Sequence, residues 1–134
     1  MYRVVTDMVE VRKYLGPASA AAFDFETAPL DQWRHEDKAA LDPHKAYIAG
    51  VSFSTAEGDG IYVPITQRVG NNADVGEVMA LLSDFAANNK IIKIAHNLAF
   101  EASFLYKHGI IIQPPVYDTM LAAMMTLKSN TEFR

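Results

Sequence analysis

The stretch AAAFDFET, residues 20–27, decides how this sequence folds. A short apolar run followed closely by a proline is typical of a buried β-strand. Side chains alternate between the two faces of a strand, so Phe23 and Phe25 share one face while Asp24 and Glu26 share the other. Two like charges separated by roughly 7 Å repel each other, and acidic residues are depleted from strands. A purely structural strand therefore has no reason to carry this acidic pair.

A divalent cation would remove the repulsion between these two carboxylates. Mg²⁺ and Mn²⁺ prefer oxygen ligands, and one ion can bind two acids at this spacing. The alternative is a strand whose outer face is exposed to water, because an Asp-x-Glu pattern after an apolar run also arises by chance. Both explanations stay open for this segment taken alone.

The rest of the chain alternates strand-like and helix-like segments around this strand. Strand patterns occupy residues 2–6, 47–54, 60–65, 91–95 and 110–117, and helical patterns follow Asp7, Asp74, Asn97 and Asp118. The strands on either side of the turn at 57–60 predict a hairpin, and Pro114 and Pro115 place the last strand late in the sheet or at its edge. Residues 31–46 predict a long polar loop with room for one helical turn. This order indicates an α/β fold in which helices flank a mixed sheet.

The composition excludes several classes of protein. The 134 residues are expected to form one domain, and the absence of cysteine excludes a disulfide scaffold, a thiolate zinc site and a cysteine nucleophile. A net charge of −4 excludes a globally basic nucleic-acid binder, although residues 90–134 carry a local charge of +2. The apolar runs are too short to span a membrane and the first residues lack a signal-peptide core, so a cytoplasmic location with no membrane partner is expected.

A second acidic position follows the strand-like segment at 91–95. The sequence HNLAFE, residues 96–101, predicts a turn and the first turn of a helix. Asn97 and Glu101 are four residues apart and share one face of that helix. An ordinary helix start explains the same residues, because Asn is a common N-cap and the helix dipole favours a carboxylate in the first turn. Only the combination with Asp24 and Glu26 makes Glu101 a candidate for the same site.

Four segments, taken in order, carry a resemblance to a known family. They are FDFETAPLD at 23–31, IAGVSFSTAEGDGIYVPI at 48–65, HNLAFE at 96–101 and VYDTMLAAMM at 116–125. This ordered set resembles the proofreading 3′–5′ exonuclease domain of family A DNA polymerases, within the ribonuclease H-like superfamily of exonucleases that use four acids. The resemblance covers nearly the whole chain. It implies a ribonuclease H-like mixed sheet of antiparallel hairpin strands and parallel strands, flanked by helices.

The same resemblance implies a reaction and its cofactors. The reaction is hydrolysis of the 3′-terminal phosphodiester of DNA with release of a nucleoside monophosphate, supported by two divalent ions, Mg²⁺ or Mn²⁺. Catalytic and metal-binding roles would fall to Asp24 on both ions, to Glu26 on the first ion and to Glu101 on the second. The resemblance implies that the chain is part of a DNA polymerase or of a phage nuclease. The partners implied are the 3′ end of single-stranded DNA and a polymerase domain in the same or another chain, in DNA replication.

Four further positions match substrate-binding residues of the family: Thr27, Leu30, Asn97 and Phe100. Core packing is the alternative for Leu30 and Phe100. Trp33, Arg34 and His35 in the polar loop could add stacking or phosphate contacts to a single-stranded end.

The sequence also departs from the family pattern. Glu101 stands where the polymerase pattern most often has Asp, and the loop at 31–46 is longer than usual. The third motif, a Tyr or His four residues before the last Asp, is absent, and Asp118 is better explained as a helix cap. Residues 1–134 are therefore expected to form a single exonuclease-like domain whose C-terminal part is missing. A ribonuclease D-like exoribonuclease and a non-catalytic module that binds nucleic acid or a protein partner remain the alternatives.

Overall fold

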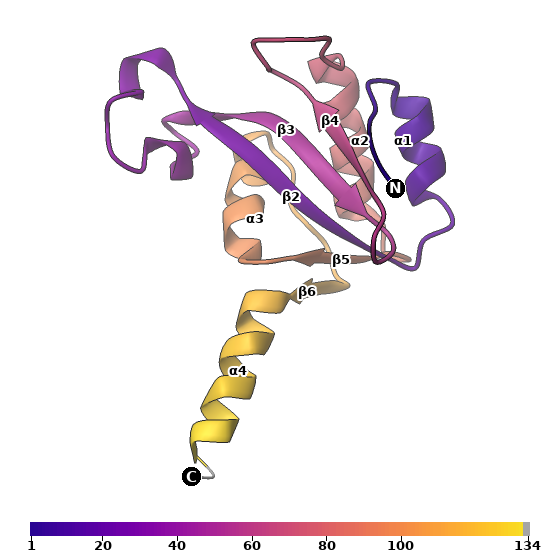
Figure 1. The fold of residues 1–134 in the computed structure, drawn as a ribbon, viewed down its shortest axis with the longest axis vertical. Coiled ribbons are helices and arrows are strands. Elements are labelled where there is room, and N and C mark those ends of the chain that lie inside the picture. The colour runs from indigo at the N-terminus through magenta and orange to yellow at the C-terminus, as the bar shows by residue number, and fades with distance from the viewer. Residues whose placement is uncertain (133–134) are drawn as a thin grey trace.

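The computed structural model describes residues 1–132, and side chains for residues 1–127, as a sheet of six strands with four α-helices (Figure 1). The elements are β1 Tyr2–Val4, α1 Met8–Leu15, β2 Ala20–Pro29, the 3₁₀ turns η1 Asp31–Trp33 and η2 Ala39–Leu41, β3 Ala46–Ser54, β4 Gly60–Pro64, α2 Val75–Ala87, β5 Ile92–Ala95, α3 Leu98–Lys107, β6 Val116–Asp118 and α4 Thr119–Glu132. The predicted α/β class and element order are confirmed. Within these residues no helix has both the length and the apolar character of a membrane span.

The sheet is mixed, with the strand order β1-β4-β3-β2-β5-β6. The central strand β2 runs antiparallel to β3, and β3 runs antiparallel to β4, so the predicted hairpin is confirmed. The pairs β1–β4, β2–β5 and β5–β6 are parallel. The two short strands β1 and β6 form the edges, and for β6 this agrees with the position predicted from Pro114 and Pro115.

One face of the sheet packs against α1 and α2. The ring of Phe85 on α2 makes edge-to-face contacts with Phe23 on β2 and Phe53 on β3, with centroid distances of 5.3 and 5.2 Å. Such contacts add to the burial of apolar area. Arg12 on α1 forms an ion pair with Asp84 on α2 at 2.8 Å, which joins the two helices. The helices therefore cover the face that carries the phenylalanines, and the acidic face of β2 points away from α2.

The opposite face of the sheet is hollowed by a cavity of about 730 Å³. Its walls come from β1, β4, β3, β2 and β5 and from the start of α4, and they include Asp24, Ser52, Tyr62, His96 and Thr119. Apolar atoms of the strands form most of the lining of the cavity. One of the two predicted acids of β2 therefore borders an open cavity.

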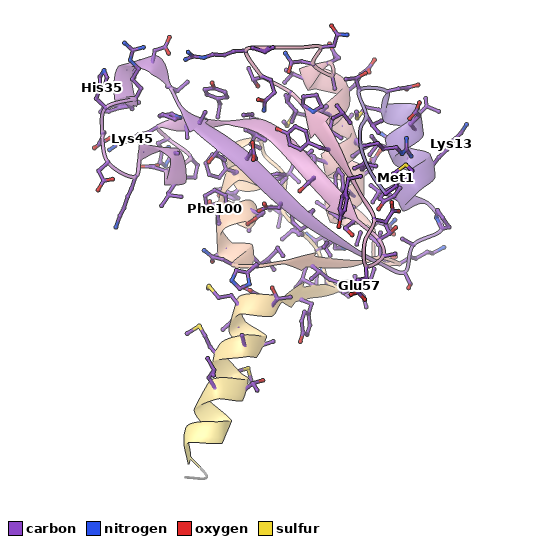
Figure 2. The ribbon with its side chains drawn as sticks, viewed as in Figure 1. Met1, Lys13, His35, Lys45, Glu57 and Phe100 are labelled. Atoms are coloured by element: carbon purple, nitrogen blue, oxygen red, sulfur yellow. The ribbon has the colours of Figure 1, made fainter. Side chains whose placement is uncertain are left out.

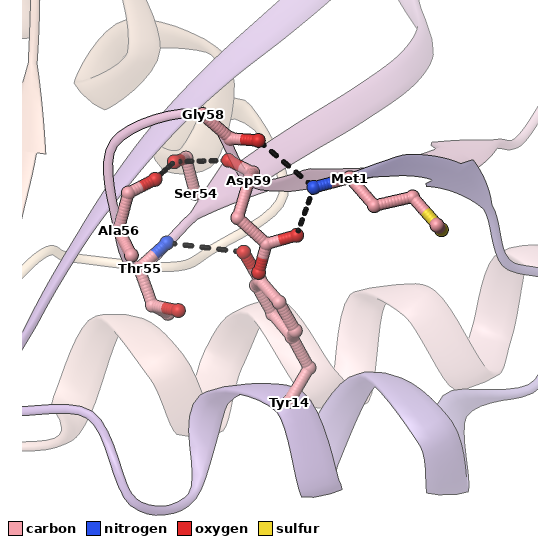
Figure 3. A network of polar contacts seen from close by, with 7 residues as sticks. All are labelled: Met1, Tyr14, Ser54, Thr55, Ala56, Gly58 and Asp59. Carbon is pink, nitrogen blue, oxygen red and sulfur yellow. Dashed lines mark hydrogen bonds and ion pairs between the residues drawn. The ribbon is translucent and has the colours of Figure 1, made fainter.

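The edge of this cavity is held by contacts among the N-terminus, the hairpin turn and α1 (Figure 3). The Met1 ammonium donates to the Gly58 carbonyl at 2.8 Å and to the Asp59 carboxylate at 3.1 Å. The backbone N–H of Thr55 donates to the Tyr14 hydroxyl at 3.1 Å. These contacts fix β1, which lines the cavity, beside β4.

The structure corrects several details of these predictions, beginning with the strand expected at 2–6, which ends at Val4. The strand expected at 110–117 is only Val116–Asp118, because prolines have no N–H to donate and pairing with β5 starts at the Pro115 carbonyl. The central strand is longer than 20–27 and continues to Pro29. The loop at 31–46 contains two 3₁₀ turns rather than one helical turn.

Candidate active site

The strand β2 presents Asp24 and Glu26 on one face. Both side chains are exposed, whereas Phe23 and Phe25 are 3% and 4% exposed. The prediction that the two acids share a face is therefore confirmed. Directly after Glu26 the register between β2 and β3 shifts by one residue, which leaves Ala49 as the extra residue of a β-bulge. Bulges are common beside active sites because they redirect side chains.

Glu101 lies in the first turn of α3 and faces Asp24. Its side chain is 1% exposed, and its Oε2 atom has no hydrogen-bond partner among the described residues. The pKa of Glu101 is raised to about 8, first by burial, then by its interaction with the Asp24 side chain, and to a smaller extent by the negative charges of Asp24 and Asp118. The predicted juxtaposition of Glu101 with the acidic face of β2 is confirmed for Asp24.

Glu26 has a different neighbour. Glu26 lies opposite Gly50 on β3, and the Tyr62 hydroxyl lies over Gly50. The pKa of the Tyr62 hydroxyl is raised by burial and then by the charge and hydrogen bonding of the nearby Glu26 carboxylate. Within the part of the chain that the structure describes, no three Asp, Glu, His or Cys side chains converge as a group that could hold a cation. The structure thus joins Asp24 with Glu101 and joins Glu26 with Tyr62. A shared metal site of the three acids stays a prediction.

The donor set nevertheless fits a hard divalent cation. A buried carboxylate oxygen without a partner is costly, and a second carboxylate beside it increases that cost. Oxygen-rich ligand sets of this kind are the ones that Mg²⁺ and Mn²⁺ prefer. Asp24 and Glu101 are therefore suited to hold such an ion, and Glu26 follows Asp24 by two residues on the same face.

Asp118 joins the starts of α3 and α4. Its carboxylate accepts from the backbone N–H groups of Asn97 and Leu98, and from that of Met120, each at 3.0 Å. Burial acts to raise its pKa, but these backbone hydrogen bonds lower it overall. The predicted capping role of Asp118 is confirmed. The alternative in which the Asn97 side chain caps α3 is wrong, because Asn97 occupies the N-cap position with φ 68° but its side chain makes no capping bond.

The predicted substrate-binding side chains are distributed around the acids. The Thr27 hydroxyl donates to the Ala40 carbonyl at 2.6 Å and so holds the long loop. Leu30 is half-buried at the end of β2. Phe100, on the side of the molecule that carries the loop with His35 and Lys45 (Figure 2), is half-buried and packs against Phe104 with a centroid distance of 5.1 Å. Core packing, the alternative for Phe100, is thus observed on one side of its ring.

The aromatic residue of the loop has a partner of its own. The ammonium of Lys45 lies 4.9 Å from the ring centroid of Trp33 and forms an ion pair with Glu36 at 2.8 Å. This cation–π contact covers one face of the indole.

Two residues of the site were missed in the sequence. Tyr62 lies opposite Ser52, which lies opposite Asp24, so the three share a row across three strands. That row depends on strand register, which period-2 alternation does not specify. His96 lines the cavity, and its Nδ1 lies 3.0 Å from the Thr119 hydroxyl. Its position directly after β5 was the available signal.

Comparison with known proteins agrees with this geometry. A family model described as 3′–5′ exonuclease matches residues 2–131. DNA polymerase I of Chloroflexus aurantiacus is 30% identical over 123 residues, which cover 92% of this chain and 12% of that protein. The structure of Brucella melitensis NrnC with bound Mg²⁺ has a TM-score of 0.60 at 20% identity and covers 96% of this chain and 52% of its own. An EXD2 exonuclease domain soaked in Mn and GMP has a TM-score of 0.54 at 18% identity, with coverages of 92% and 58%.

The two solved structures share the fold at these identities, and the chain spans about an eighth of the curated polymerase it matches. The family match extends over nearly all of the described residues. The chain therefore belongs to the 3′–5′ exonuclease family, in the form found in DNA polymerase I.

Proposed function

We propose that this chain is a proofreading-type 3′–5′ exonuclease domain, whose reaction is hydrolysis of the 3′-terminal phosphodiester of DNA. The observation that carries the proposal is the contact between exposed Asp24 and buried Glu101, whose Oε2 has no partner among the described residues. These two acids come from distant parts of the chain, and Asp24 also borders the cavity of about 730 Å³. Polar groups arranged in this way are costly unless they serve binding or catalysis.

Each acid has a separate role in the proposal. Asp24 would hold both divalent ions, Glu26 would hold the first ion and help to orient the attacking water, and Glu101 would hold the second. When bound, the ions would supply activation of water and stabilisation of the departing 3′ oxygen. Leu30 and Phe100 contact the terminal bases, and Asn97 and Thr27 line the path of the strand. The likeness to proteins described with Mg²⁺ and with Mn and GMP supports the choice of ions.

We also propose where the chain acts and which partners it has. We place the chain in the cytoplasm, acting on a single-stranded 3′ end next to a polymerase domain of the same or another chain. The relatives support the polymerase domain as a partner, because the matched region is one part of a DNA polymerase I. We also propose that residues 1–134 form a single exonuclease-like domain.

End-specific binding tests the function independently of turnover. Fluorescence anisotropy would follow a labelled single-stranded DNA with a free 3′ end, with Mn²⁺ or with EDTA. We expect binding that requires Mn²⁺, that linear DNA competes away and that circular single-stranded DNA does not. The variant Asp24→Asn should lose the Mn²⁺-dependent part, and Glu57→Gln, an exposed acid in the hairpin turn, should retain it.

The other outcomes separate the alternatives. Binding without any effect of Mn²⁺ or of Asp24→Asn would overturn the proposal in favour of a non-catalytic binding module. Tighter Mn²⁺-dependent binding of an RNA of the same sequence would overturn the choice of DNA and favour the ribonuclease D-like alternative.

A further inference from the structure

A polar arrangement beside Glu26 has no role in the chemistry described so far. It consists of Gly50 and the bulge residue Ala49 on β3, Tyr62 on β4, and Gln67, which follows β4. Glu26 lies directly opposite Gly50 across the β2–β3 pair, and Gly50 lies opposite Pro64 across the β3–β4 pair. A side chain reaching from β4 to Glu26 must therefore cross over Gly50.

Tyr62 makes that crossing, and only a glycine permits it. A Cβ atom built on Gly50 would collide with the hydroxyl and the ring of Tyr62. The ring lies on the bare backbone of β3, with its hydroxyl directed toward the strand that carries the acids. Any other residue at position 50 would displace the tyrosine from Glu26.

Gln67 fixes the direction of the tyrosine hydroxyl. Its Nε2 atom donates to the Tyr62 oxygen at 2.6 Å and to the Ala49 carbonyl at 3.1 Å. The Gln67 backbone is held in turn by Asn72, whose side chain accepts from the Gln67 N–H at 2.9 Å and donates to the Gln67 carbonyl at 3.1 Å. Because the tyrosine oxygen already accepts a hydrogen bond from Gln67, its own proton is free to be donated to Glu26.

The bulge supplies the anchor for this arrangement. The Ala49 carbonyl also accepts from the backbone N–H groups of Ile65 and Thr66, at 2.9 and 3.0 Å. The residues after β4 are thereby tied to the bulge that follows Glu26. The Ala49 carbonyl, Gly50 and Tyr62 thus lie next to one another on β3 and β4, beside the carboxylate of Glu26 on β2.

We propose that Tyr62 is a positioning residue for Glu26: its hydroxyl, oriented by Gln67 and accommodated by Gly50, donates to one carboxylate oxygen and leaves the other directed toward Asp24 and a cation. The inference rests on the proposed function and deepens it. A carboxylate held by a hydrogen bond from a neighbouring group is better oriented as a metal ligand than a freely rotating one. Tyr62 acts through Glu26 and is not itself required to touch the substrate.

Mn²⁺ affinity of the full chain, measured by electron paramagnetic resonance of the free ion, tests the inference without turnover. We expect Tyr62→Phe to weaken Mn²⁺ binding by about 3- to 10-fold, the equivalent of one hydrogen bond. Gly50→Ala should weaken it at least as much by displacing the ring. Tyr106→Phe, which removes an exposed hydroxyl on α3, should leave the affinity unchanged.

A double-mutant cycle distinguishes positioning from a general loss of structure. In a Glu26→Gln background, Tyr62→Phe should no longer change the Mn²⁺ affinity, because the hydroxyl acts only through that carboxylate. The same four proteins, unfolded by urea in EDTA, should also show an interaction energy between positions 26 and 62, which measures the contact in the absence of metal.

The outcomes separate this inference from the proposed function. Unchanged Mn²⁺ affinity of Tyr62→Phe, while Asp24→Asn loses binding, would overturn the role of Tyr62 and leave the metal site intact. If Tyr62→Phe weakened Mn²⁺ binding equally in the Glu26→Gln background, the role of Tyr62 would also be overturned, because the effect would then be structural. Absence of Mn²⁺ binding by the unmodified chain would refute the metal site, and with it this role of Tyr62.

Discussion

Glu101 combines nearly complete burial with a second carboxylate at its side. The sequence indicates only that an acid occupies the first turn of a helix, a position that the helix dipole makes ordinary. What distinguishes this residue is that the fold places it at 1% exposure against Asp24. Its cost to the folded chain therefore depends on pH and on whether a cation is bound.

We expect the stability of the chain in EDTA to fall as pH rises. The folded pKa of Glu101, about 8, lies above its ordinary value of 4.5, so the folded state binds the extra proton. This contribution is fully present below pH 4.5 and is lost as pH rises through about 8. It amounts to roughly a few kcal/mol at most. Urea unfolding between pH 4 and 9 measures it.

Glu101→Gln is the variant that isolates this effect. It should flatten the pH dependence and be more stable than the unmodified chain at pH 8 in EDTA. Added Mn²⁺ should stabilise the unmodified chain at that pH and have little effect on the variant. Parallel pH profiles for the two proteins would contradict the prediction.

Among the secondary-structure elements, β5 has a pattern of side-chain burial that is the reverse of the one its sequence suggests. Residues 91–95 form an apolar segment interrupted by Lys93, which suggests an exposed lysine among buried neighbours. In the structure Ile92 is 40% exposed, whereas Lys93 is fully buried and donates to the Asn88 carbonyl at 2.6 Å. Burial lowers the pKa of Lys93. The end of α2 offers a carbonyl to the buried ammonium, and that acceptor is invisible in the strand's own sequence.

The contact between α1 and the hairpin turn gives a prediction at the level of elements. Tyr14→Phe removes the acceptor of the partly buried Thr55 N–H and should lower the free energy of unfolding by about 1 kcal/mol. Tyr106→Phe, which alters a side chain that is 71% exposed, should change it much less. Urea denaturation of the two variants measures the difference, and equal losses would show that the Tyr14 contact adds nothing.

For the whole molecule, α4 is the element least supported by the rest of the fold. It extends away from the sheet (Figure 1), and none of its described side chains, residues 119–127, is buried. In α2, by contrast, five side chains are buried against the sheet. Helices draw most of their stability from such packing.

Hydrogen exchange should therefore be much faster in α4 than in α2. Amides of residues 120–127 are expected to exchange by local opening, and those of α2 by opening of the core. Exchange monitored by mass spectrometry at two protein concentrations measures this difference and separates it from protection by self-association. Equal protection of both helices at the lower concentration would disprove it.

The number of acids in the site determines how much DNA cleavage is expected of the 134-residue chain. The recognised motifs supply three acids where the family uses four, so the chain should bind metal weakly and show little or no shortening of single-stranded DNA. Mg²⁺ demands near-octahedral geometry, so cleavage supported by Mg²⁺ should be reduced more than cleavage supported by Mn²⁺. A labelled oligonucleotide incubated with each ion measures this. Robust Mg²⁺-dependent shortening from the 3′ end, abolished by Asp24→Ala, would show that three acids suffice.

The sequence by itself determined the α/β class, the order of the elements and the shared face of Asp24 and Glu26. Each of these follows from local periodicity, because the alternation of a strand and the caps of a helix are properties of neighbouring residues. The predictions from sequence were wrong at the boundaries of strands. Pro114 and Pro115 make β6 start only at Val116, and the bulge lets β2 continue to Pro29.

Only the tertiary structure decided which acids meet. The contact between Asp24 and Glu101 requires β2 and β5 to pair in one register and α3 to start beside them, and the contact between Glu26 and Tyr62 requires β3 to present a glycine between two other strands. Strand register is a property of pairs of segments that are distant in sequence, and it depends on the packing of the whole core. The residue types of the site can therefore be recognised along the chain, whereas their partners, their burial and their charge state follow from the fold.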